Sequence, residues 1–148
     1  MSMRDRKSTI KFAALLGLAL VLLAGLSGCS APKPAGYSDQ QVAGMTENIL
    51  KAIDANDYQK CTQDFSAQMN AAFTQAQFNQ IRSMLQNASG AFVSVGTFSL
   101  SNNQGYAAYR FTSRYANETV YVTVTFLVGG QKVEGLWFDS ANLRKISQ

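Results

Sequence analysis

The stretch from Thr119 to Asn142, TVYVTVTFLVGGQKVEGLWFDSAN, contains the strongest fold signal in the chain. In its first half, valine or phenylalanine occupies every second position, which is typical of a β-strand with one buried face. The Gly-Gly pair at 129–130 then supplies two residues that tolerate positive φ, as a two-residue type I′ hairpin turn requires. The pattern predicts a hairpin whose inner face carries Phe126, Val133 and Trp137.

Two earlier runs, 92–100 and 106–115, alternate in the same way. If their turns are centred on 103–104 and 117–118, the inner positions of four strands align in rows. These rows are Phe98, Tyr109, Phe126 and Val133; Gly96, Phe111, Val124 and Gly135; Ser94, Ser113, Val122 and Trp137; and Phe92, Tyr115, Val120 and Asp139. The sequence therefore predicts a four-stranded antiparallel meander whose apolar face packs on helices.

Helix signals fill the chain before the strands. Ser38 with Gln41, and Thr74 with Gln77, have the spacing of capping boxes that begin helices. Apolar residues recur at helical spacing after both starts, and two shorter helical pieces lie between them. The predicted fold class is α+β, with residues 38–148 forming one domain in which the helices come first.

The N-terminus carries a targeting signal. Four basic residues, Arg4, Arg6, Lys7 and Lys11, precede an apolar run at 12–26, which is shorter than the roughly 20 residues of a membrane-spanning helix. The run ends in Leu-Ser-Gly-Cys at 26–29, which resembles the lipobox of a prokaryotic lipoprotein. This resemblance implies removal of residues 1–28, a lipid on Cys29 and a tether over 29–37; the alternative is an uncleaved membrane anchor. Either way, we expect the domain outside the cytoplasm, in the cell envelope and tethered to a membrane.

Composition excludes several classes of site. The formal net charge of +4 falls to +1 without residues 1–28, so the mature chain is not expected to bind nucleic acid. The chain has no histidine, and we expect neither a metal nor a cofactor. With Cys29 lipidated, Cys61 has no partner for an intrachain disulfide, and we interpret it as a small buried hydrophobe.

Several short stretches carry a family resemblance. They are Ile49-Leu50-Lys51-Ala52, Asn56-Asp57-Tyr58, Asp64-Phe65-Ser66, Ala72-Phe73-Thr74 and Gly135-Leu136-Trp137-Phe138. Over about residues 40–140 the chain resembles the family called domain of unknown function 3887. Helices followed by a curved meander also resemble the cone-shaped fold of nuclear transport factor two and its relatives. The resemblance implies a secreted or lipid-anchored protein, and it brings no catalytic residues with it.

Polar groups gather at one end of the predicted inner face. They are Ser94, Ser113, Tyr115 and Asp139, with Trp137 beside them. A concave apolar surface with a few convergent polar groups is the usual form of a ligand pocket. The pattern predicts a pocket for a small, partly apolar ligand, unless the helix from Thr74 to Ser89 fills that space.

Two classes of function fit these observations. The first is a non-enzymatic lipoprotein that binds a small ligand or another envelope protein. The second is an isomerase or cyclase in which Asp139 is the base and Tyr115 or Tyr109 donates a hydrogen bond to an oxyanion. Asp139 inside a closed cavity would favour the enzyme, whereas Asp139 at the wet end of a strand would favour binding.

The opposite face of the predicted sheet mixes polar and large apolar side chains. It carries Arg110, Arg114, Tyr121, Thr123, Thr125, Lys132, Glu134, Leu136 and Phe138. Such a face is either solvated or a surface through which two copies form a homodimer.

Overall fold

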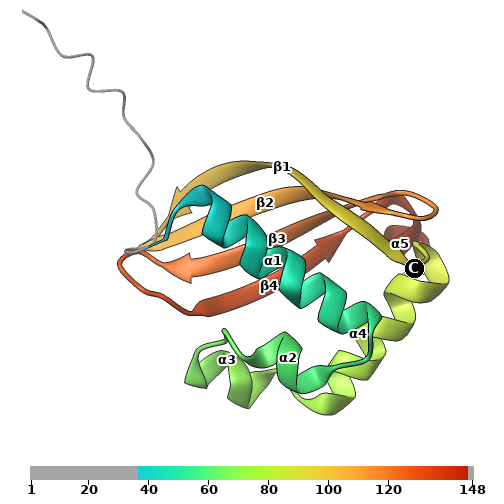
Figure 1. Ribbon diagram of the computed structural model, residues 1–148, viewed down its shortest axis with the longest axis horizontal. Coiled ribbons are helices and arrows are strands. Elements are labelled where there is room, and N and C mark those ends of the chain that lie inside the picture. The colour runs from blue at the N-terminus through green and yellow to red at the C-terminus, as the bar shows by residue number, and fades with distance from the viewer. Residues whose placement is uncertain (1–36, 147–148) are drawn as a thin grey trace, which may run out of the picture.

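The structure, a computed structural model, describes residues 37–146, so the predicted signal segment and most of the tether lie outside the described residues. The elements in chain order are α1 (Asp39–Asp54), α2 (Tyr58–Thr62), α3 (Ala67–Ala72), α4 (Gln75–Ala88), β1 (Phe92–Asn103), β2 (Tyr106–Tyr115), β3 (Thr119–Leu127), β4 (Val133–Asp139) and α5 (Ala141–Ile146). The predicted α+β class is confirmed. Four antiparallel strands form one open sheet in the order β1-β2-β3-β4, and α1 lies across it (Figure 1).

Both predicted helix starts are confirmed. Ser38 Oγ accepts a hydrogen bond from the Gln41 amide at 3.2 Å, and Gln41 Oε1 accepts one from the Ser38 amide at 2.8 Å. Thr74 Oγ1 likewise accepts from the Gln77 backbone N–H at 3.3 Å, and Gln77 Oε1 accepts from the Thr74 backbone N–H at 2.9 Å. These reciprocal bonds satisfy amides at the helix N-termini that have no partner within the helix.

The inner faces of β2 and β3 form the centre of the core with α1 and α4. Every second residue is buried: Ala107, Tyr109, Phe111, Ser113 and Tyr115 in β2, and Val120, Val122, Val124 and Phe126 in β3. The β2–β3 register differs from the predicted rows by two residues, so that Tyr109 pairs with Val124. The turn is closed by a hydrogen bond of 2.9 Å from the Tyr115 backbone N–H to Glu118 O. A displacement of two keeps every side chain on its face, so the predicted faces of β2 and β3 are confirmed.

The β3–β4 hairpin corrects the prediction. Phe126 pairs with Val133 as predicted, but Thr125 pairs with Gly135, so Glu134 is an extra residue in the ladder. This bulge turns the second half of β4 over, because a shift of one residue exchanges the two faces of a strand. Leu136 and Phe138 therefore pack against the core, and the placement of Trp137 on the inner face was wrong.

The loop of that hairpin is also longer than predicted. The strands end at Leu127 and resume at Val133, and the amide of Gly130 donates to Leu127 O at 2.9 Å. Gly129 has a φ of +84°, whereas Gly130 does not take a positive φ, so the turn is not type I′.

Strand β1 departs from the predicted rows at two places. Phe92 pairs with Tyr115 as predicted, but register shifts follow Phe92 and Val95, and Phe98 pairs with Phe111. Between the shifts the chain passes close to β2: a Cβ on Gly96 would lie 2.5 Å from the Thr112 carbonyl oxygen. The irregularity turns Ser94 away from the core to an exposed position.

A cluster around Glu118 holds α5, which the sequence did not predict. The Glu118 carboxylate, in the β2–β3 turn, accepts hydrogen bonds from Ser89 Oγ at 2.6 Å, Ser140 Oγ at 2.7 Å and the Asn142 amide at 3.1 Å. Ser140 Oγ also accepts from the Leu143 amide at 3.1 Å. One carboxylate thus joins the end of α4, a strand turn and the start of α5.

Between residues 37 and 146, no helix is both long and apolar enough to cross a bilayer.

Candidate functional site

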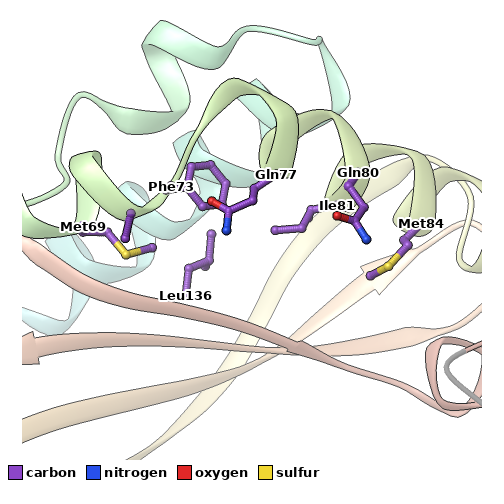
Figure 2. A pocket seen from close by; sticks show the side chains of 8 residues that line it. Met69, Phe73, Gln77, Gln80, Ile81, Met84 and Leu136 are labelled. Carbon is purple, nitrogen blue, oxygen red and sulfur yellow. The ribbon is translucent and has the colours of Figure 1, made fainter.

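An apolar groove lies between α3, α4 and the edge strand β4. Its volume is about 360 Å³, within the range of small-molecule sites. Figure 2 shows Leu136 facing the side chains of α4 across this space. The residues that line it are Met69, Ala72, Phe73, Gln77, Gln80, Ile81, Met84 and Leu136.

The groove follows from how α4 and β4 are built. On α4, Phe78 and Leu85 are buried in the core, while Ile81 and Met84 lie beside that stripe and are only half-buried. On β4, the bulge at Glu134 turns Leu136 to the same side. The wall of α4 and the wall of β4 therefore both present apolar side chains to a space that neither fills.

The groove is lined by apolar side chains and two amides. No charged or titratable side chain lines the groove, and its polar groups are the amides of Gln77 and Gln80 on exposed positions of α4. Thioether side chains are flexible, so Met69 and Met84 can adapt to the shape of a bound group. Across residues 37–146, no cluster of three or more histidine, cysteine, aspartate or glutamate residues could hold a metal ion.

Two of the predicted pocket residues, Ser113 and Tyr115, lie on the inner face. Both are buried, and no residue of the described chain pairs with either hydroxyl. Desolvation by burial, with a further contribution from Asp54, raises the pKa of Tyr115 above its usual value. The space beside Tyr115 is only about 10 Å³, roughly the room of one water, because α1 and α4 fill this end, with Leu85 among the lining residues.

Two others, Trp137 and Asp139, lie on the outer face. Trp137 is 70 % exposed. Asp139 is paired with Arg144 and, at 3.5 Å, with Arg110. The Arg144 hydrogen bond, reinforced by the charges of both arginines, holds the Asp139 pKa below its usual value despite an opposing desolvation effect. The structure therefore separates Asp139 from Tyr115, and Asp139 lacks the closed cavity that the enzyme hypothesis requires of its base.

The fifth predicted residue, Ser94, lines a different hollow of about 450 Å³ beside the β2–β3 turn. Tyr115 contributes to this hollow, but most of the residues that line it have polar side chains, among them Arg114, Asn117 and Glu118. Glu118 already accepts three hydrogen bonds from the protein. The five predicted residues thus do not form one pocket, and the hollow lacks the apolar walls expected for the predicted ligand.

Cys61 has the predicted character. It is fully buried, and burial together with the nearby Asp57 carboxylate raises the pKa of its thiol to about 12. A thiol in this state is a poor nucleophile at neutral pH.

Sequence reasoning did not identify the groove. Met69, Ile81 and Met84 have the spacing of ordinary core residues, and only their incomplete burial distinguishes them. Leu136 was placed on the outer face because strict alternation does not anticipate a bulge. The one available signal was the presence of two methionines in the segments that flank Phe73.

Fold and groove together define a small α+β domain with an open apolar groove beside an edge strand. A family model described as a protein of unknown function, DUF3887, matches residues 46–136. The chain belongs to this family, and the matched span contains every residue that lines the groove. No curated protein and no solved structure matches the chain.

Proposed function

We propose that this protein is a lipid-anchored lipoprotein of the cell envelope whose domain, related to the cone-shaped fold of nuclear transport factor two, binds an apolar group without catalysis. The single observation that supports binding is the groove between α3, α4 and β4, which is apolar on both walls. The order of helices before an open meander supports the relation to the cone-shaped fold.

The anchoring part of the proposal rests on the sequence Leu-Ser-Gly-Cys at 26–29 after a short apolar run. We expect the mature chain to begin at Cys29 with a lipid on its thiol, and Cys29→Ala to prevent both processing and lipidation. Mass spectrometry of the membrane fraction tests this. A mature N-terminus elsewhere, or Cys29 without a lipid, would contradict the anchoring proposal.

The binding part rests on complementarity between the groove and an apolar group. Phe73, Ile81 and Leu136 offer apolar surface, and removing such surface from water favours association by about 25 cal/mol per Å². Gln77 and Gln80 offer amide donors and acceptors at the rim. The ligand class is therefore an uncharged group with an apolar body and at least one polar atom.

Methionine methyl resonances provide a direct test. Of the five methionines, Met69 and Met84 line the groove, whereas Met45 is buried in the core. The test is a titration of benzyl alcohol into the lipidated protein, which carries ¹³C-methyl methionine and is held in nanodiscs. We expect saturable shifts at Met69 and Met84 and none at Met45. Equal shifts at all three methyl groups, or none up to the solubility limit, would overturn the binding proposal.

A matched pair of variants adds specificity. Met84→Gln makes the groove wall polar, whereas Leu127→Gln makes the same kind of change at a residue that is 43 % exposed at the end of β3. Both variants should keep the melting temperature of the parent within a few degrees. We expect Met84→Gln alone to weaken binding, by about tenfold for the loss of some 1.4 kcal/mol.

A further inference from the structure

Strand β4 has an unpaired edge beside the groove. The sheet order leaves β3 on one side of β4 and no strand on the other. At its start, this free side binds the protein's own chain: the Val133 amide donates to Asp64 O and Val133 O accepts from the Ser66 amide, each at 2.9 Å. The chain then leaves the edge as α3 begins at Ala67, after only one bridge.

The rest of the edge offers backbone groups with no protein partner among residues 37–146. Backbone groups alternate sides along a strand, and Val133 points its N–H and C=O away from β3. After the bulge, Thr125 faces Gly135 and Thr123 faces Trp137 across the ladder. Leu136 and Phe138 consequently present their N–H and C=O to the free side. An edge of this kind pairs readily with another extended chain.

The groove and the edge are contiguous, because Leu136 belongs to both. Its backbone lies on the edge and its side chain faces α4 (Figure 2). In a chain added to β4, side chains would alternate between the two faces of the sheet. One row would enter the groove toward Ile81 and Met84, and the other would lie on the outer side.

Charge restricts the occupant further. The eight lining residues carry no charge, and a charged side chain loses hydration in an apolar groove without a partner there. The carboxylate of Glu134 at the start of the edge is already hydrogen-bonded to Ser66 Oγ at 2.7 Å. Asp139, at the other end, is paired with Arg144. An uncharged occupant therefore matches the whole length of the edge.

We propose that the β4 edge and the α3–α4 groove together bind an extended, uncharged peptide segment with apolar side chains at alternate positions, which adds a fifth strand to the sheet. This inference rests on the proposed function, because it assigns a partner to the same groove. Main-chain hydrogen bonds to Leu136 and Phe138 supply affinity for any extended chain, and the groove selects its side chains.

Hydrogen exchange tests the edge and methyl resonances test the groove in one preparation. The probe is a pool of N-acetylated, C-amidated hexapeptides in which valine, leucine or methionine alternates with threonine or glutamine. Added to the lipidated protein in nanodiscs, the pool should slow amide exchange within residues 134–139 by about tenfold or more. It should also shift Met69 and Met84. Strand β1, the other edge of the sheet, serves as the control and should not change.

A second pool, N-methylated at every residue, cannot donate a backbone hydrogen bond to the edge in either strand orientation and should protect β4 less than the first. Slower exchange limited to β1, or no slowing by either pool, would overturn the peptide inference. If benzyl alcohol still shifts Met69 and Met84 in that case, the proposed binding function stands and the peptide assignment alone fails. If neither probe shifts the two methyl groups, both proposals fail.

Discussion

The two hairpins of the sheet share β3 and the same alternating sequence pattern, yet one follows its pattern and the other does not. In the β2–β3 pair, Glu118 makes its contacts with the helices from the turn, outside the ladder. In the β3–β4 pair, the contacts with residues 64–66 fall inside β4, at Val133 and Glu134, where the extra residue sits. The comparison indicates that a strand keeps its strict in–out alternation of side chains when its contacts with other elements lie outside the paired residues.

The largest effect should come from the regular hairpin. Phe111 is fully buried, with its ring 5.2 Å from Phe98 and 6.4 Å from Tyr109. Phe111→Ala should lower the free energy of unfolding by about 3–5 kcal/mol, because it leaves a cavity in the core. Urea denaturation measures the change, with Thr123→Ala on the opposite face as the control. A loss below about 1 kcal/mol would mean that the inner face is not the core.

Glu118 should give the next effect and its pH dependence. Burial raises the pKa of Glu118, but hydrogen bonds from Ser89, Ser140 and Asn142 outweigh it, so the pKa lies below its usual value. The carboxylate therefore stabilises the fold above the usual glutamate pKa, and this contribution disappears as the pH falls through the lowered value. Glu118→Gln should cost about 1–3 kcal/mol at neutral pH and flatten that acid-side slope.

The control for Glu118 is Glu47, an exposed carboxylate that pairs with Lys51 on α1 at 2.7 Å. Glu47→Gln should change stability by no more than about 0.5 kcal/mol, as is usual for a surface pair on a helix. Similar losses for the two variants at neutral pH would show that the Glu118 cluster does not hold the hairpin turn.

In the irregular hairpin, Ser66 tests which contact maintains the bulge. Ser66→Ala removes the Oγ that caps α3 at the Met69 amide, at 3.1 Å, and that donates to Glu134. We expect a loss of about 1 kcal/mol, typical of an N-cap. The backbone bond from Ser66 to Val133 remains, so Trp137 should stay exposed to acrylamide quenching. A protected Trp137 in this variant would assign the bulge to the serine hydroxyl instead.

The smallest effect should come from Trp137 itself. Because its side chain is 70 % exposed, Trp137→Ala should change the free energy of unfolding by less than about 1 kcal/mol. Phe138→Ala, one residue further along β4, removes a ring that packs against the core and should cost clearly more. The order of the two denaturation midpoints reports which face of β4 is buried, and the reverse order would restore the unbulged register.

Sequence reasoning predicted the α+β class, the starts of α1 and α4, and the faces of β2 and β3, but not the faces of β1 and β4 beyond their irregularities. Capping boxes depend on residues three apart, and the alternation of β2 and β3 depends on neighbours, so local sequence contains both signals. The candidate groove includes Leu136, which faces inward after the bulge at Glu134. Beside the bulge, the Ser66 amide donates to Val133 O, and these two residues lie far apart in the chain. The bulge places Leu136 on the inner face and Trp137 on the outer face. The local sequence around residue 134 contains no signal for this bulge.

The burial of Cys61 has a practical consequence for kinetics. A thiol that is fully buried, with its pKa raised to about 12, reacts with maleimide only when the structure around α1 and α2 opens. In a chain that carries Cys29→Ala, Cys61 is the only thiol. Its rate of labelling at neutral pH therefore reports how often this part of the native structure opens. Quenching of the exposed Trp137 indole does not report such opening.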